Sequence, residues 1–161
     1  MSKRRVAIVI AGTCLLIMTA LNAGAWADKS AVGTWKLDAA KSNYGNMPAP
    51  KFEQMVVTVD TPESLKWSLK GVGADGKSYI SSYDGPTDSK FHAMLSSEGS
   101  KTVAYTRTGS NLSWIVKDKS GAIIETGSGQ LSADGNTLTL SGAMQGQKGK
   151  SAFVSVFNRA Q

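Results

Sequence analysis

Hydrophobic residues recur at every second position in short runs from Ala31 onward. Four runs alternate clearly with polar neighbours; their apolar positions are Gly33, Trp35 and Leu37; Met55, Val57 and Val59; Leu65, Trp67 and Leu69; and Leu112, Trp114 and Val116. A period of two predicts β-strands that turn one face to a core and the other to water. The pattern is therefore typical of an antiparallel sheet.

Six further strands are predicted where the alternation is less regular. They span 79–83, 91–95, 103–107, 123–129, 138–140 and 153–159, which makes ten strands in all. Gly, Asn and Asp separate the runs at intervals of about ten residues, so most connections are predicted to be hairpin turns. The exception is 38–51, where Pro48 and Pro50 indicate a loop, with one helical turn that has Asp38 as its N-cap.

Ten sequential hairpin strands leave two exposed edges unless the sheet closes on itself. Closure removes the unpaired edge groups. We therefore predict an all-β fold, an antiparallel up-and-down β-barrel of about ten short strands. A β-sandwich is the alternative.

The N-terminal segment has the pattern of a secretory signal. Lys3, Arg4 and Arg5 precede the apolar run 6–21, and the small residues in 23–27 offer cleavage sites. We predict that 1–27 is a cleaved signal peptide and that 28–161 is the folded domain. An uncleaved membrane anchor is the competing interpretation. The prediction places the protein in the periplasm or outside the cell.

Composition limits the class of the predicted domain. The whole chain has 161 residues and a net charge of +6, and residues 28–161 carry 15 Lys and Arg against 12 Asp and Glu, or +3. The only cysteine, Cys14, lies in the predicted signal, so no disulfide can stabilise the domain. About 130 residues suffice for a packed core. Export and the lack of a basic block set nucleic-acid binding aside.

Residues for catalysis or metal binding are scarce. His92 is the sole histidine, which excludes a multi-histidine metal site, and its neighbours Phe91, Ala93 and Leu95 have the parity of an inward face, so His92 is predicted to face solvent. Glu53 and Glu125 could form a hydrolytic pair only if separate strands brought them together. No nucleophile, base and orienting group can be named together. We predict no catalytic residue, no metal and no cofactor.

The segment Gly71–Gly76 reads G-x-G-x-x-G. A dinucleotide site of that sequence needs a helix directly after the glycines. The following Lys77–Ser81 has a strand pattern, so the segment is predicted to be a hairpin turn.

Aromatic residues occupy many predicted inward positions. Trp67, Tyr105, Trp114 and Phe157 could line a ligand cavity or fill the barrel. Arg107 shares the parity of Tyr105 and could contact an anionic head group. An exposed arginine at the strand end is the alternative that we favour for Arg107.

Both ends of the predicted domain resemble a known family. The first strand reads Gly33-Thr34-Trp35-Lys36-Leu37, and the chain closes with Val156-Phe157-Asn158-Arg159-Ala160, similar to the ends of calycin-type barrels, the lipocalins and intracellular fatty-acid-binding proteins. Lys41-Ser42 and the turn Ser132-Ala133-Asp134-Gly135 before Thr-Leu-Thr resemble small exported bacterial proteins described as lipocalin-like.

The resemblance implies structural roles at one end of the barrel. Gly33, Trp35 and Arg159 would close that end, with the Trp35 ring beneath the guanidinium, a contact that contributes about 0.5–2 kcal/mol. Fatty-acid-binding proteins often hold the lipid carboxylate with Arg-x-Tyr in the last strand. The matching positions here are Ser155 and Phe157, so the resemblance does not carry that clamp over.

Two functions of different class follow. The first is non-catalytic binding or carriage of a small hydrophobic or amphipathic molecule in the bacterial cell envelope, with no nucleic acid and no membrane span after cleavage. The second is a solid barrel that contacts another envelope protein through loop 38–51 or its strand edges. An enzyme is the weakest of the hypotheses, because no catalytic set can be named.

Overall fold

A computed structural model describes residues 29–146 and 149–160, and the predicted signal peptide 1–27 lies outside them. The chain forms ten strands and, in these residues, no helix. The strands are β1 (Gly33–Leu37), β2 (Phe52–Asp60), β3 (Ser64–Val72), β4 (Ser78–Pro86), β5 (His92–Ser96), β6 (Lys101–Thr108), β7 (Asn111–Asp118), β8 (Ile123–Leu131), β9 (Thr137–Gly146) and β10 (Gly149–Arg159). Within that range nothing helical is long and apolar enough to cross a membrane.

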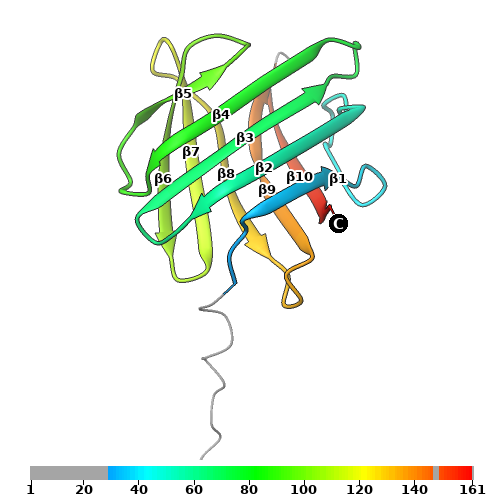
Figure 1. Cartoon of the computed structure of the whole chain (residues 1–161). Helices are drawn as coiled ribbons and strands as arrows, with labels where there is room; N and C mark the ends of the chain where they lie inside the picture. Colours follow the sequence, from blue (N-terminus) through cyan, green and yellow to red (C-terminus); the bar gives the residue numbers. More distant parts are fainter. Residues whose placement is uncertain (1–28, 147–148, 161) are drawn as a thin grey trace, which may run out of the picture.

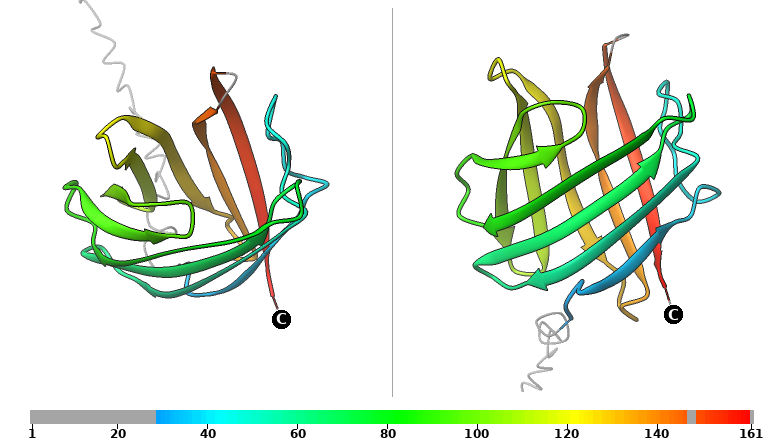
Figure 2. Two further views of the ribbon diagram at one scale, coloured as in Figure 1. Left: turned by 90° about the horizontal axis from the view of Figure 1, so that it is seen from above. Right: turned by 45° about the horizontal axis from the view of Figure 1, so that its top comes forward.

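The strands close into one antiparallel barrel. Each strand pairs with the next along the chain, and β1 pairs with both β2 and β10 (Figures 1 and 2). Trp35 is opposite Arg159 on one side and Met55 on the other. Closure satisfies the backbone groups that a sandwich would leave at its edges. The predicted up-and-down barrel is thus confirmed, and the sandwich alternative is wrong.

The connections define two ends of the barrel. We name the Glu53 end after the residue near the start of β2; it holds loop 38–51 and the turns 73–77, 97–100 and 119–122. The Arg159 end holds the turns 61–63, 87–91, 109–110 and 132–136. Position along a strand therefore tells which end of the interior a side chain approaches.

Two local predictions concern the connections. The predicted turn after Asp38 is present as a hydrogen-bonded turn without a helix: the backbone N–H of Lys41 donates to the Asp38 carbonyl at 3.2 Å and to the Asp38 side-chain Oδ1 at 3.3 Å, so Asp38 caps it. The connection predicted between the strands 79–83 and 91–95 begins later than expected, because Asp84–Pro86, despite its turn-forming residues, continues β4 and pairs with β3. Hydrogen bonding to β3 keeps this segment extended, and the turn propensity of its residues does not take such a partner into account.

The inward face of β5 was also predicted wrongly. Phe91 and Leu95 are exposed, whereas Met94 packs against the core. His92 lies opposite the buried Val103, and its ring hydrogen-bonds to the Asp88 carboxylate at 2.8 Å. The prediction assumed that the apolar residues Phe91 and Leu95 face the core, but both lie on the outer surface of the barrel.

Packing at the Arg159 end surrounds one tryptophan. The Trp35 side chain is fully buried, the Arg159 guanidinium lies 4.3 Å from its ring centroid, and its indole N–H donates to the Ala31 carbonyl at 2.8 Å. The guanidinium also donates to the carbonyls of Gly135 and Val32 at 2.8 and 2.6 Å. A side chain at position 33 would overlap this guanidinium, which requires Gly33. The structure thus places all three residues of the expected closure together.

Candidate functional site

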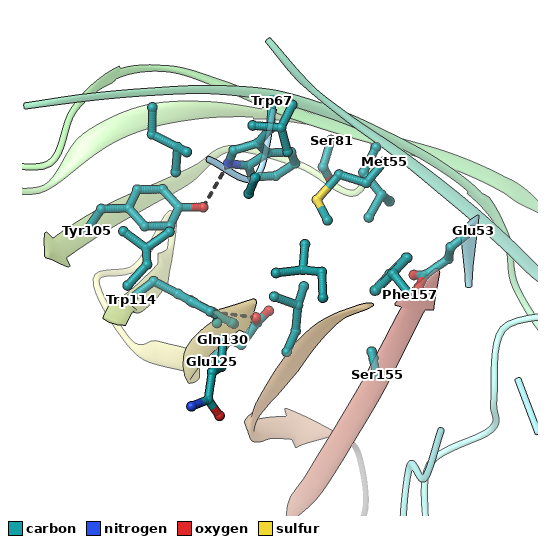
Figure 3. A pocket seen from close by; sticks show the side chains of 18 of the residues that line it. Glu53, Met55, Trp67, Ser81, Tyr105, Trp114, Glu125, Gln130, Ser155 and Phe157 are labelled. Carbon is teal, nitrogen blue, oxygen red and sulfur yellow. Dashed lines mark hydrogen bonds between the residues drawn. The ribbon is translucent and has the colours of Figure 1, made fainter. Parts of the chain in front are cut away.

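A large cavity occupies the interior of the barrel. Its volume is about 1500 Å³, and it reaches from the Glu53 end to the Arg159 end. Most of its wall is apolar or aromatic and comes from β2, β3, β6, β7, β8, β9 and β10: Met55, Val57, Leu65, Trp67, Leu69, Tyr105, Leu112, Trp114, Val116, Ile124, Leu138, Leu140, Phe153 and Phe157. The inward aromatics therefore line a space and do not fill it (Figure 3).

The four aromatic residues expected to form a wall do line this cavity. The indole N–H of Trp67 donates to the Tyr105 hydroxyl at 2.9 Å (Figure 3), so both polar tips are satisfied and the ring faces remain for apolar contact. Burial raises the pKa of Tyr105, which keeps its hydroxyl protonated. Trp114 comes from the neighbouring β7, and Phe157 is buried in β10.

Arg107 points into the barrel near the Arg159 end. Its guanidinium pairs with the Asp60 carboxylate, and the side chains are 16% and 8% exposed, so the exposed orientation favoured for Arg107 was wrong. The other oxygen of Asp60 accepts the backbone N–H of Ala31 at 2.7 Å. The Nε atom of Arg107 is buried and has no hydrogen-bond partner. This ion pair is neutral overall, and the Nε–H of Arg107 takes no part in it.

Two carboxyl groups line the cavity towards the Glu53 end. Glu53 accepts a hydrogen bond from the Tyr79 hydroxyl at 2.5 Å, and Glu125 accepts one from the Trp114 indole at 2.7 Å. Burial raises the pKa of Glu53, and the charge of Glu125 adds to the rise, against the lowering effect of the Tyr79 bond. Burial likewise raises the pKa of Glu125, against the Trp114 hydrogen bond and the charge of Lys101. Both groups therefore resist ionisation in the empty cavity.

Loop 38–51 forms part of the cavity wall at the same end. The backbone of Asn43 exchanges hydrogen bonds with Val154 of β10 at 2.7 and 2.6 Å, and the Ser155 hydroxyl donates to that of Tyr44 at 2.9 Å. Tyr44, Met47, Pro48 and Pro50 line the cavity. The residue in place of the fatty-acid clamp, Ser155, thus positions a loop tyrosine.

Sequence reasoning missed part of the polar lining. Glu53 has the parity of Met55 and Val57, so its inward direction was available from the pattern. Asp60 has the opposite parity and faces inward because the β2–β3 register shifts between Val57 and Val59. A second shift, in the β7–β8 register, accompanies the placement of the adjacent residues Ile124 and Glu125 at the cavity. β-Bulges of this kind have no reliable signal in one sequence.

Replacing Glu53 and Glu125 by glutamine is expected to stabilise the empty protein at pH 7. Glutamine keeps an acceptor for Tyr79 and Trp114 but removes two poorly solvated charges, and we expect a gain of about 1 kcal/mol in the free energy of unfolding. The raised pKa values of Glu53 and Glu125 in the folded wild type determine the pH dependence. The stability that these two protonated groups contribute to the wild type is complete below their unfolded-state pKa and is lost as pH rises through their folded-state pKa.

Urea unfolding of wild type and Glu53→Gln/Glu125→Gln at pH 4 and pH 7, followed by far-UV circular dichroism, measures this effect. The advantage of the double variant should be larger at pH 7 than at pH 4. Comparing the two proteins at each pH cancels the opposite contribution of aspartates such as Asp38 and Asp118, whose pKa values are lowered by hydrogen bonds. An advantage that is equal at both pH values would show that neither carboxyl has a raised pKa.

The cavity offers little for catalysis or metal binding. Within 29–146 and 149–160 there is no group of three His, Cys, Asp or Glu side chains placed to hold a metal ion. Glu53 and Glu125 do share the cavity, which the sequence alone could not show. Their polar contacts are Tyr79 and Trp114, and neither of these is a nucleophile held by a base. The arrangement suits binding of an apolar body with a few polar contacts.

Comparison with one solved structure supports the fold, and a second is similar to a lesser degree. The chain superimposes on zebrafish ileal bile acid-binding protein complexed with cholic acid with a TM-score of 0.53 and 12% sequence identity, over 81% of this chain and 100% of that one. Rv2717c from M. tuberculosis aligns with a TM-score of 0.49 and 17% identity, over 81% and 92% of the two chains. No family model matches the sequence. No curated protein matches it either.

The architecture and the interior together define the class of protein. This is a calycin-like antiparallel β-barrel with a large, mostly apolar cavity. The resemblance found in the terminal strands is confirmed at the level of the fold.

Proposed function

We propose that this protein binds and carries a small hydrophobic or amphipathic molecule, without converting it, in the bacterial cell envelope. The interior cavity is the observation that carries the proposal. Its volume of about 1500 Å³ exceeds the roughly 300–1000 Å³ of most ligand sites, and its wall is mainly apolar. The similarity in fold to a bile acid-binding protein agrees with this function. The envelope location rests on the predicted signal peptide 1–27.

Trp67, Tyr105, Trp114 and Phe157 are proposed to contact the apolar body of the ligand. Arg107 lines the cavity and is proposed as a further polar contact. The alternative, an interaction module, assumed a solid barrel. The cavity removes that premise, although loop 38–51 remains available to a partner protein.

The alanine variant of Trp67 tests the proposed wall. We expect wild type to bind the neutral fluorescent probe N-phenyl-1-naphthylamine with enhanced emission, and Trp67→Ala to raise the Kd about tenfold, since one buried aromatic contact contributes about 1–2 kcal/mol. Fluorescence titration measures both values. The matched control is Ile115→Ala, whose side chain lies 38% exposed on the outer face of β7. Equal effects of the two variants would contradict binding inside the barrel.

Native mass spectrometry of the protein purified gently from its own host tests carriage directly. A reproducible added mass, recovered in an organic extract of the same sample, would identify the class of ligand. A bare chain with co-purifying protein would favour the interaction module.

A further inference from the structure

We propose that the ligand is an amphipathic amine, whose protonated nitrogen binds at the Glu53 end of the cavity, where Glu53 and Glu125 line the wall, while its apolar body lies along the aromatic wall towards the Arg159 end. This rests on the proposed function and names its class of ligand.

The charged residues at the Glu53 end leave an excess of two carboxyl groups. Four charged side chains line the cavity there: Glu53, Glu98, Lys101 and Glu125. Lys101 pairs with Glu98, with 2.8 Å between Nζ and Oε2. Among the described residues no lysine, arginine or histidine forms an ion pair with Glu53 or Glu125. With Lys101 paired to Glu98, the carboxyl groups of Glu53 and Glu125 have no cationic partner of their own at this end.

Both carboxyl groups have free acceptor positions. An ionised carboxylate offers about four lone-pair sites. Glu53 uses one for Tyr79 and Glu125 uses one for Trp114, and both side chains are drawn at the cavity, each on its own strand, in Figure 3. An ammonium group has three donors, so it can bind to the free acceptor positions of either carboxylate. Tyr79 and Trp114 are donors themselves, so they hold the carboxylates in place without competing for the amine.

The Glu53 end of the cavity is unfavourable for an anionic ligand. At the Arg159 end the lining holds Arg107, which is already neutralised by Asp60, and the exposed Lys29. A ligand carboxylate at the Glu53 end would meet two further carboxyl groups, and like charges in a partly dehydrated space repel. The apolar length between the two ends fits the hydrocarbon part of an amphipathic amine.

Burial supplies a dependence on pH. Because burial raises the pKa values of Glu53 and Glu125, the carboxyl groups take up protons at a higher pH than free glutamate does. Affinity for an amine should fall as these groups become protonated in mildly acidic solution. It should also fall in alkaline solution, where the amine loses its proton.

Three probes of equal chain length test the proposal: dodecylamine, dodecanol and dodecanoate, each below its micelle concentration. Displacement of N-phenyl-1-naphthylamine at pH 7 gives their affinities for wild type, Glu53→Gln, Glu125→Gln and the double variant. Glu63→Gln is the matched control, because this exposed residue makes the same charge change outside the cavity lining. Circular dichroism verifies that each variant is folded.

Wild type should bind dodecylamine about tenfold more tightly than dodecanol, and more tightly still than dodecanoate. The double variant should lose this preference, and Glu63→Gln should behave as wild type. Equal or tighter binding of dodecanoate by wild type, or an amine preference that survives in the double variant, would overturn the amine proposal alone. Failure of all three probes and of N-phenyl-1-naphthylamine to bind would overturn the proposed carrier function as well.

Discussion

Replacing Trp35 by alanine is expected to lower the free energy of unfolding by about 3–5 kcal/mol, the usual cost of removing a large aromatic side chain from a packed core. The side chain is fully buried, is covered by the Arg159 guanidinium and donates a hydrogen bond to the Ala31 carbonyl. Its loss leaves a void beneath the guanidinium. It also removes one of the hydrogen bonds that tie the segment before β1 to the barrel.

Urea unfolding followed by far-UV circular dichroism measures this loss. Trp35→Phe keeps a ring under Arg159 but has no N–H for Ala31, so an intermediate loss of about 1–2 kcal/mol is expected. Trp67→Ala is the second comparison. Trp67 borders the cavity on one face, so the same substitution should cost less there than at Trp35. A loss below about 1 kcal/mol for Trp35→Ala would mean that this end of the barrel is not closed by tryptophan and arginine.

The second large effect is expected at Gly142 of β9. A Cβ at this position would overlap the carbonyl oxygen of Thr126 and lie 2.7 Å from the Cα of Gly127, so the backbones of β8 and β9 would have to separate. The two glycines are opposite each other, and Trp114 lies opposite Gly127 on the next strand. Gly142→Ala is therefore expected to destabilise the protein by about 3 kcal/mol, at the upper end of the cost of overpacking.

The substitution Gly129→Ala provides the matched control. Its Cβ would meet the end of the Leu140 side chain at 3.1 Å, and a flexible side chain can move where a backbone carbonyl cannot. Thermal unfolding of both variants should show a clearly larger drop in Tm for Gly142→Ala. Similar Tm values would indicate that the β8–β9 pair relaxes without loss of packing.

These stability effects and the binding effects arise in different parts of the interior. Trp35 and Gly142 hold the barrel closed and in register, whereas Trp67, Glu53 and Glu125 border the space inside it. Substitutions of Trp35 and Gly142 should lower the free energy of unfolding and leave the ligand preference unchanged. Substitutions of Glu53 and Glu125 should change the ligand preference and leave the barrel folded. The same strands therefore carry residues that stabilise the barrel and residues that bind the ligand.

Much of the fold could be predicted from the sequence, because the physical signal is local. A period of two with turn residues about every ten positions specifies strands and hairpins, and ten sequential strands can satisfy their edges by closure. The terminal pair of Trp35 and Arg159 was available from the resemblance to calycin-type barrels. The inward aromatics Trp67, Tyr105 and Trp114 followed from parity alone.

Only the tertiary structure decided what the interior contains. Whether the aromatic residues fill the barrel or enclose about 1500 Å³ depends on its circumference and on how closely strands approach at glycines such as Gly127 and Gly142, which are properties of the whole sheet. The pairing of Arg107 with Asp60 depends on a register shift that turns Asp60 inward. Glu53 and Glu125, 72 positions apart in the sequence, share one cavity only because the barrel closes. The sequence by itself determined the strands, their order and their inward aromatic residues, because alternation is a local pattern. The cavity and its two carboxyl groups without cationic partners arise from contacts across the barrel, which no local pattern encodes.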